Sequence, residues 1–246
     1  MKYTHHYTVK WHDTDANREV RPSQILMYMQ ETANLQLRDS GMPLDDLRDK
    51  YGLGFILSRI SVRILEPLRA YDKIEVQTWI CDSRGLSFNR CFAILKEGRV
   101  VAEAYSAWAL LNLREKRLVK VNEFEFPFTG EETLEIDLPK RVHFSPSIAV
   151  EEAGERTIRY ADIDYNGHMN NTRYPDMLCD FVPSVFARRV RGFTLSYLRE
   201  ATYGHTLRVY RAQTAGGYLF RTVDADGATC LEAYLEVEDR ADVQSL

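Results

Sequence analysis

Residues 11–17, WHDTDAN, return 149 residues later as YADIDYN at residues 160–166. Other stretches repeat in the same order, namely 62–65 with 195–198 and 98–105 with 227–234. A period this long exceeds the units of about 20 to 50 residues from which solenoid proteins are built. The sequence therefore predicts two related domains, with only the second copy of the repeat continuing into GHMNN at 167–171.

The bulk composition is that of a globular protein, with 45% hydrophobic and 28% charged residues. A net charge of −4 argues against general nucleic-acid binding, which depends on a basic surface. No apolar run approaches the roughly 18 residues needed to span a bilayer, and the N-terminal residues MKYTHH lack the apolar stretch of a signal peptide. We therefore expect a cytoplasmic protein that does not insert into membranes.

The cysteines and one arginine cluster were also considered as functional signals. The cysteines are Cys81, Cys91, Cys179 and Cys230. Their spacing fits neither a metal site nor a disulfide framework, so we interpret them as small buried apolar groups. The clustered arginines are Arg188, Arg189, Arg191 and Arg199. They form either a solvated face or a docking surface for an acidic partner.

Both halves show one helix followed by several strands. In the first half we expect a strand at 7–11, a helix from Pro22 to about Gly41, a loop at 43–54, and a Glu97–Gly98 hairpin turn. The strands expected after the two helices are 55–64, 73–81, 87–95, 100–111, 190–198, 206–214, 218–224 and 228–237. The second helix is expected from Asn171 to Pro183. This pattern is typical of the α+β class, with an antiparallel sheet wrapped around a long helix in each domain. We place the domains at 1–130 and 148–246, with a linker at 131–147.

The repeated turn could be the start of a calcium-binding loop, because it has the pattern D-x-D-x-N-G from Asp162 to Gly167. Position 12 of such a loop requires a glutamate, but here it is Arg173. A cation at that position would repel calcium, and the segment before the turn looks extended. We therefore disfavour a calcium site.

A catalytic interpretation starts from His168, which lies just before the expected helix start, where free backbone N–H groups favour negative charge. Asn166 can donate an amide N–H, and Asp164 can organise the turn through bonds to the backbone. Each could instead be an ordinary turn or capping residue. In the first copy the position of His168 is Glu19 and that of Glu200 is Pro67, so the scaffold requires neither residue.

The run DYNGHMNN at 164–171, together with YLRE at 197–200, resembles the acyl-acyl carrier protein (acyl-ACP) thioesterases of plants and bacteria. That family consists of two tandem hot-dog domains, and the resemblance covers nearly the whole chain. It implies that Asp164, Asn166, His168 and Glu200 are the catalytic residues. It also implies hydrolysis of fatty acyl-ACP to free fatty acid and holo-ACP in fatty acid biosynthesis, with no cofactor and no metal.

The resemblance further implies that the first domain is a non-catalytic copy that binds the acyl chain. Plant members commonly have cysteine after the glutamate, whereas this chain has Ala201, which excludes a covalent cysteine mechanism at that position. We expect Glu200 to activate water, and Asn166, His168 and amides at the helix terminus to polarise the thioester carbonyl. Asp164 would act as an organiser.

Three other functions share parts of this pattern. An acyl-CoA thioesterase would use the same chemistry on another carrier. A non-catalytic acyl-thioester binder would need the pocket but not Glu200, and a hot-dog dehydratase or hydratase also uses a histidine and a carboxylate. Because tandem halves can pair with each other, either a monomer or a homodimer is expected.

Overall fold

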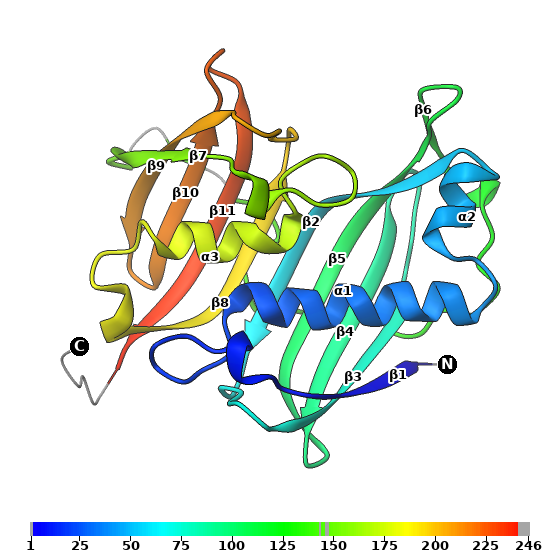
Figure 1. Cartoon of the computed structure of the whole chain (residues 1–246), viewed down its shortest axis with the longest axis horizontal. Coiled ribbons are helices and arrows are strands. Elements are labelled where there is room, and N and C mark those ends of the chain that lie inside the picture. The colour runs from blue at the N-terminus through cyan, green and yellow to red at the C-terminus, as the bar shows by residue number, and fades with distance from the viewer. Residues whose placement is uncertain (1, 143, 146–147, 241–246) are drawn as a thin grey trace. The chain divides into compact units, whose positions relative to one another are not determined.

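The computed structural model describes residues 2–142, 144–145 and 148–240 (Figure 1). The chain divides into two compact units, of which unit 1 comprises Met1–Val20 with Gln24–Asp137, and unit 2 comprises Arg21–Ser23 with Leu138–Leu246. The expected linker is thus divided between the units at Asp137, and its residues 143, 146 and 147 lie outside the described residues. Residues 241–246 of the second predicted domain also lie outside them.

Unit 1 is an antiparallel sheet with one long helix across it (Figure 1). Its elements are β1 (Tyr3–Thr8), α1 (Pro22–Asp39), α2 (Leu44–Asp49), β2 (Leu53–Ile64), β3 (Lys73–Ile80), β4 (Phe88–Lys96), β5 (Arg99–Asn112) and β6 (Arg117–Val119), with 3₁₀ helices η1 (Trp11–Asp13) and η2 (Val121–Glu123). The strand order is β1-β3-β4-β5-β2, and β6 pairs with β5. The apolar side of α1 is buried through Ile25, Leu26, Met29, Ala33 and Leu37. Burying each of the larger side chains contributes about 1.5–3 kcal/mol, so this helix is held mainly by packing.

Unit 2 repeats this topology with a much shorter helix. Its elements are β7 (Glu151–Thr157), η3 (Tyr160–Asp162), η4 (Asn171–Arg173), α3 (Tyr174–Cys179), η5 (Val185–Ala187), β8 (Arg188–Tyr197), β9 (Thr206–Thr214), β10 (Gly217–Val223) and β11 (Thr229–Asp239). The strand order is β7-β9-β10-β11-β8, which matches unit 1 strand for strand. The α+β class expected from the sequence is confirmed.

Backbone hydrogen bonds confirm the alignment of the two copies. Asp15 N donates to Glu19 O at 2.8 Å, and in the second copy Asp164 N donates to His168 O at 2.9 Å. Downstream, Val20 N donates to Leu68 O at 2.8 Å, and Met169 N donates to Ala201 O at 2.7 Å. Glu19 is therefore the structural equivalent of His168, and Pro67 is that of Glu200.

The second helix begins where expected but ends early, at Cys179 instead of near Pro183. Pro175 lies in its first turn, and the residue before a proline disfavours helical backbone, so the segment starts as the 3₁₀ turn η4. Beyond Cys179 the amides of residues 180–182 bond to carbonyls three residues earlier, which tightens the last turn. Tyr174, Met177, Leu178 and Val182 are still buried, so the apolar stripe was correct while the helix length was wrong.

Two further elements were not expected from the sequence. The loop expected at 43–54 contains α2, which is anchored by the buried Leu47. Strand β7 is formed by EEAGERT, a charged segment without apolar alternation, and pairs only with β9 at the edge of the sheet. The hairpin turn at Glu97–Gly98 is confirmed, since both residues have positive φ and join Lys96 to its partner Arg99.

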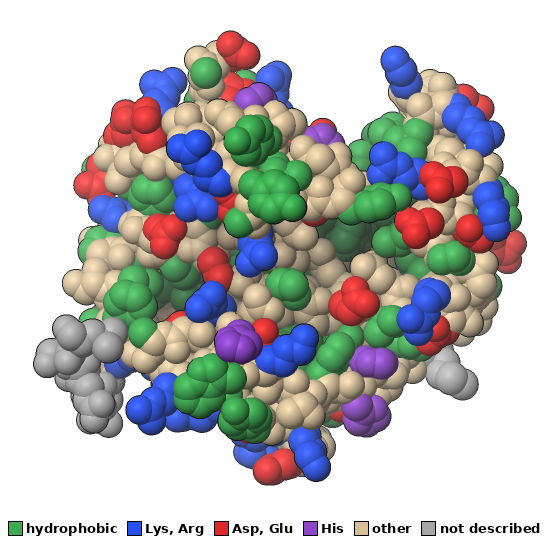
Figure 2. All heavy atoms as spheres, in the orientation of Figure 1, with side chains coloured by type: hydrophobic (Ala, Val, Ile, Leu, Met, Phe, Trp, Pro, Cys, Tyr) green, Lys and Arg blue, Asp and Glu red, His purple; other side chains and the backbone are tan. Residues whose placement is uncertain are grey.

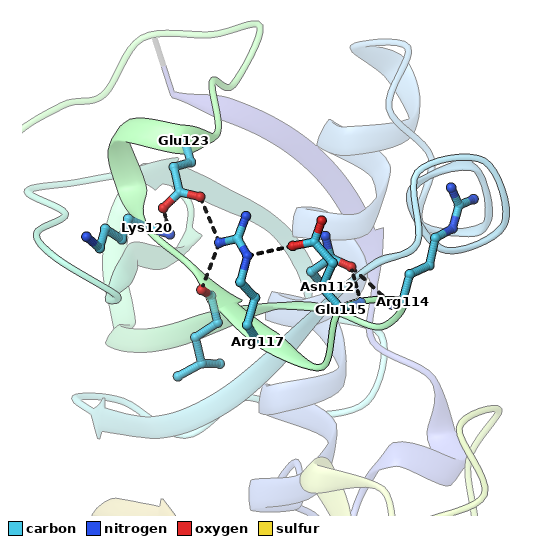
Figure 3. A network of polar contacts seen from close by, with 7 residues as sticks. Asn112, Arg114, Glu115, Arg117, Lys120 and Glu123 are labelled. Carbon is cyan, nitrogen blue, oxygen red and sulfur yellow. Dashed lines mark hydrogen bonds and ion pairs between the residues drawn. The ribbon is translucent and has the colours of Figure 1, made fainter.

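The turn between β5 and β6 carries an exposed polar network (Figure 3). Arg117 bonds Glu115 Oε2 through Nε at 2.6 Å and Glu123 Oε2 through Nη1 at 2.8 Å. Asn112 Oδ1 accepts the amides of Arg114 and Glu115 at 3.0 Å each, which closes the turn. Exposed ion pairs add little to stability, so Arg117 provides a suitable site for control substitutions in unit 1.

Candidate functional site

The turn that follows η3 in unit 2 is organised by Asp164. Its Oδ1 accepts the amide of Asn166 at 2.8 Å, and its carbonyl accepts the amide of Gly167 at 3.0 Å. In unit 1, Asp15 Oδ1 accepts the amide of Asn17 at 2.8 Å in the same way. Asp164 therefore serves a turn that both copies share, while Asn166 lies exposed at its tip.

Gly167 occupies a left-handed backbone conformation with φ +83° directly before His168, and no other atom would contact an added Cβ. Gly167→Ala is therefore expected to lower the free energy of unfolding by about 1–2 kcal/mol through backbone strain alone. Urea unfolding followed by circular dichroism measures this. Arg18, its equivalent in unit 1, has φ +61° with a side chain, so Arg18→Gly is not expected to destabilise. An unchanged midpoint in Gly167→Ala would contradict the strain argument.

His168 and Glu200 come together although they lie in different segments. His168 pairs with Thr202 in an isolated antiparallel bridge, and Met169 N donates to Ala201 O at 2.7 Å. These bonds place Glu200, three residues after the end of β8, beside the imidazole: His168 Nε2 and Glu200 Oε2 are 2.9 Å apart. The side chain of Glu200 is 61% exposed and that of His168 33% exposed. An imidazole and a carboxylate at this distance form a pair that can move or orient a proton.

The same place in unit 1 has no such pair. Glu19 is buried there, and Pro67 can neither give nor take a proton. Because the backbone bonds around both positions are alike in the two units, the difference lies in the side chains alone. The acid–base pair is a property of unit 2.

The amides at the start of the second helix are not all available, which corrects one expectation. Asn170 Oδ1 accepts the amide of Thr172 at 2.9 Å, and Asn170 O accepts that of Arg173 at 2.9 Å. Since an N–H with an internal acceptor is a poor donor to a ligand, the side chains of Asn166 and His168 remain the better candidates for polarising a carbonyl.

Two supporting groups were missed by the sequence reasoning. Tyr197, at the end of β8, donates its hydroxyl to Asn171 O at 2.8 Å and contacts the ring of Tyr174, with centroids 5.4 Å apart. Full burial raises the pKa of Tyr197 well above its usual value, so it stays a neutral donor that holds the helix start to β8. Asp162 accepts from Arg156 Nη2 at 2.8 Å and from Arg159 N at 2.8 Å, which anchors the turn from below. Its repetition as Asp13 was the signal that could have revealed it.

Other chemical groups near the site are limited in what they offer. Ala201 follows Glu200 and is buried, so no thiol lies at that position. Within the described residues no group of three His, Cys, Asp or Glu side chains has the arrangement of a metal site. No helix in the part of the chain described here is long and apolar enough to cross a membrane.

The arginine cluster is paired with carboxylates. The pairs are Arg188 with Asp239, Arg189 and Arg191 with Glu238, and Arg199 with Asp224, at 3.4 to 3.8 Å. On the face drawn in Figure 2, acidic and basic side chains are likewise interspersed. Local neutralisation of this kind favours the interpretation of the cluster as a solvated face.

Comparison with known families gives matches to both halves. The model of the acyl-ACP thioesterase N-terminal domain matches residues 1–126, and that of the acyl-ACP thioesterase C-terminal domain matches residues 147–234. The palmitoyl-acyl carrier protein thioesterase of Arabidopsis thaliana, a chloroplastic protein, is 23% identical over 99% of this chain and 62% of its own length. A dodecanoyl-[acyl-carrier-protein] hydrolase of Cinnamomum camphora is 23% identical over 85% of this chain and 59% of its own length. The chain thus spans about three fifths of the length of these curated relatives.

Solved structures show the same fold. An acyl-ACP thioesterase from Bacteroides thetaiotaomicron superposes with a TM-score of 0.86 at 22% identity, covering 96% of this chain and 98% of that one. The 12:0-ACP thioesterase from Umbellularia californica gives a TM-score of 0.82 at 21% identity, with coverages of 97% and 98%. At such identities the likeness establishes the fold, and the expected tandem hot-dog architecture is confirmed.

Proposed function

Because the chain belongs to the acyl-ACP thioesterase family, we propose that it hydrolyses fatty acyl-ACP thioesters to free fatty acid and holo-ACP. The observation that carries this proposal is the 2.9 Å contact of His168 Nε2 with Glu200 Oε2, which exists in unit 2 and has no counterpart in unit 1. A thioester carbonyl has little resonance stabilisation, so a positioned base and hydrogen-bond donors suffice to promote attack by water.

In the proposed mechanism Glu200 accepts a proton from water as the water oxygen attacks the carbonyl carbon. General base catalysis of this kind typically gives about 10²- to 10⁴-fold in rate. The contact uses Glu200 Oε2 and His168 Nε2, which leaves Glu200 Oε1 for the water and His168 Nδ1 for the carbonyl oxygen. Asn166 supplies a second donor. Collapse of the tetrahedral intermediate breaks the C–S bond, and the proton held by Glu200 passes to the departing thiolate.

Asp164 acts in this proposal as a positioning residue. It bonds to the backbone of the turn that carries Asn166 and His168, and Asp15 does the same in the copy that lacks the pair. The acyl chain is proposed to lie in unit 1, along α1 and the neighbouring strands, where each buried methylene contributes about 0.8 kcal/mol. This would account for the retention of a copy without the histidine and the glutamate.

The experiment that tests the proposed function is thiol release from acyl-ACP substrates of graded chain length, with the same acyl groups on CoA measured beside them. Faster release from ACP at one chain length supports the proposal. Equal or faster release from CoA identifies an acyl-CoA thioesterase instead. Tight acyl-thioester binding without thiol release identifies a non-catalytic binder, and water addition or loss without free thiol identifies a hydratase or dehydratase.

Direct attack by water makes a prediction for the residue after Glu200. Ala201→Cys is expected to leave kcat unchanged within about twofold, because a base rather than a nucleophile is needed at this site. Intact-mass spectrometry during turnover should find no acyl-enzyme on either protein. A trapped acyl adduct on the unmodified chain would refute direct hydrolysis.

The setting of this activity is proposed with it. We expect acyl carrier protein as the partner, a monomer or homodimer in solution, and a cytoplasmic location within fatty acid biosynthesis. Size-exclusion chromatography with light scattering measures the oligomeric state, and fractionation of the producing cells measures the location.

A further inference from the structure

Arg90 is a buried cation inside unit 1. It lies on β4, where its register partners are Ile80 on β3 and Ser106 on β5. Its Nη1 donates to Gln36 Oε1 of α1 at 2.5 Å and to Thr78 Oγ1 of β3 at 3.1 Å. The residue is only 7% exposed, so its guanidinium lies between α1 and the sheet.

No carboxylate of the described residues forms an ion pair with Arg90, which is unusual, since arginine is rarely fully buried without such a partner. Burial lowers the pKa of Arg90 to about 10, so the side chain still carries its charge at neutral pH. Removing a charge from water costs several kcal/mol unless a partner compensates. Two neutral acceptors on one nitrogen compensate only in part.

The other edge of the guanidinium is open. Among the described residues no acceptor bonds to Nε or Nη2, because both of the hydrogen bonds of the side chain come from Nη1. Nε–H and Nη2–H point the same way and form the fork that binds two oxygens of one group. The ring of Phe128 lies beside the guanidinium, with its centroid 5.9 Å from Cζ, and restricts access to an apolar approach.

We propose that Arg90 binds an oxygen function at the far end of an acyl chain held in unit 1, so that this protein selects acyl chains ending in a hydroxyl or carboxylate over those ending in a methyl group. The inference rests on the proposed function in one respect, namely that unit 1 receives the acyl chain along α1. Gln36 and Thr78 orient the guanidinium through Nη1, and the open fork supplies the contact. A carboxylate uses both donors and neutralises the charge, while a hydroxyl uses one.

Binding of non-hydrolysable substrate analogues tests this inference without requiring turnover. Pantetheine thioethers of one alkyl length, ending in methyl, hydroxymethyl or carboxylate, are titrated by calorimetry. A hydrogen bond to a charged group contributes about 1.5–3 kcal/mol, so the oxygen-ended analogues are expected to bind roughly tenfold or more tightly than the methyl-ended one. Equal or tighter binding of the methyl-ended analogue to the unmodified protein would overturn the inference and leave a buried water as the partner of the fork.

Variants locate the effect at the guanidinium. Arg90→Met should abolish the preference for oxygen-ended chains, and Arg90→Lys should reduce it, because lysine keeps the charge but not the fork. Arg117→Met, an exposed arginine of the same unit (Figure 3), is the matched control and should keep the full preference. A preference that persists in a folded Arg90→Met protein refutes the assignment to Arg90.

The two proposals fail separately. Absence of thiol release from every thioester, with the graded binding retained, refutes hydrolysis and supports the Arg90 site. Normal release of thiol from methyl-ended substrates, with no preference in binding, supports hydrolysis and refutes the Arg90 site.

Discussion

Glu200→Gln is expected to lower kcat for thioester hydrolysis by about 10²- to 10⁴-fold, the usual contribution of a positioned general base. Glutamine is nearly the same size as glutamate and can still hydrogen-bond His168, but it cannot accept a proton from water. The side chain of Glu200 is 61% exposed, so the substitution should leave the stability of the fold almost unchanged. Single-turnover thiol release with saturating acyl-ACP isolates the chemical step, and KM is expected to change little.

Glu152→Gln is the matched control for this substitution, because Glu152 is also an exposed glutamate of unit 2, on the edge strand β7. It should retain normal turnover. A Glu200→Gln protein that hydrolyses acyl-ACP within about threefold of the normal rate would show that the carboxylate is not the base, since general base catalysis contributes far more than that. The proposed mechanism would then have to be abandoned.

His168→Ala is expected to lower kcat by about 10²- to 10³-fold, the usual cost of losing one donor to the developing oxyanion. The substitution also removes the partner that lies 2.9 Å from the Glu200 carboxylate. Because the carbonyl becomes a stronger acceptor in the transition state than in the substrate, the loss should fall on kcat rather than on KM. His12→Gln, an exposed histidine of unit 1, serves as the control.

The double variant distinguishes a catalytic pair from two independent contributors. If His168 and Glu200 act as one unit, the protein carrying both His168→Ala and Glu200→Gln should be about as slow as the slower single variant, because groups that act together are not additive. Multiplication of the two losses would instead mean that each residue acts alone. That outcome would contradict the role assigned to their contact.

The order of elements and the catalytic candidates could be predicted from the sequence because their signals are local. β-branched and aromatic runs indicated β2 to β5 and β8 to β11 with ends correct to within about two residues, the usual uncertainty of such boundaries. The Asp164 turn could be recognised because its carboxylate bonds to an amide only two residues away. β7 escaped prediction because the strand is stabilised by pairing with β9, and its own residues show no apolar alternation.

The site itself divides along the same line. A written repeat with Glu19 and Pro67 in one copy, and His168 and Glu200 in the other, identified the half of the chain that can carry acid–base chemistry. Whether the imidazole meets the carboxylate depends on the pairing of 168–169 with 201–202, a long-range contact that no local pattern encodes. The uncompensated charge of Arg90 likewise arises only when α1 is laid on the sheet, because burial and the absence of a nearby carboxylate are properties of the packed chain. Local chemistry therefore came from the order of residues, whereas proximity and desolvation came from folding, which brings distant segments together and removes them from water.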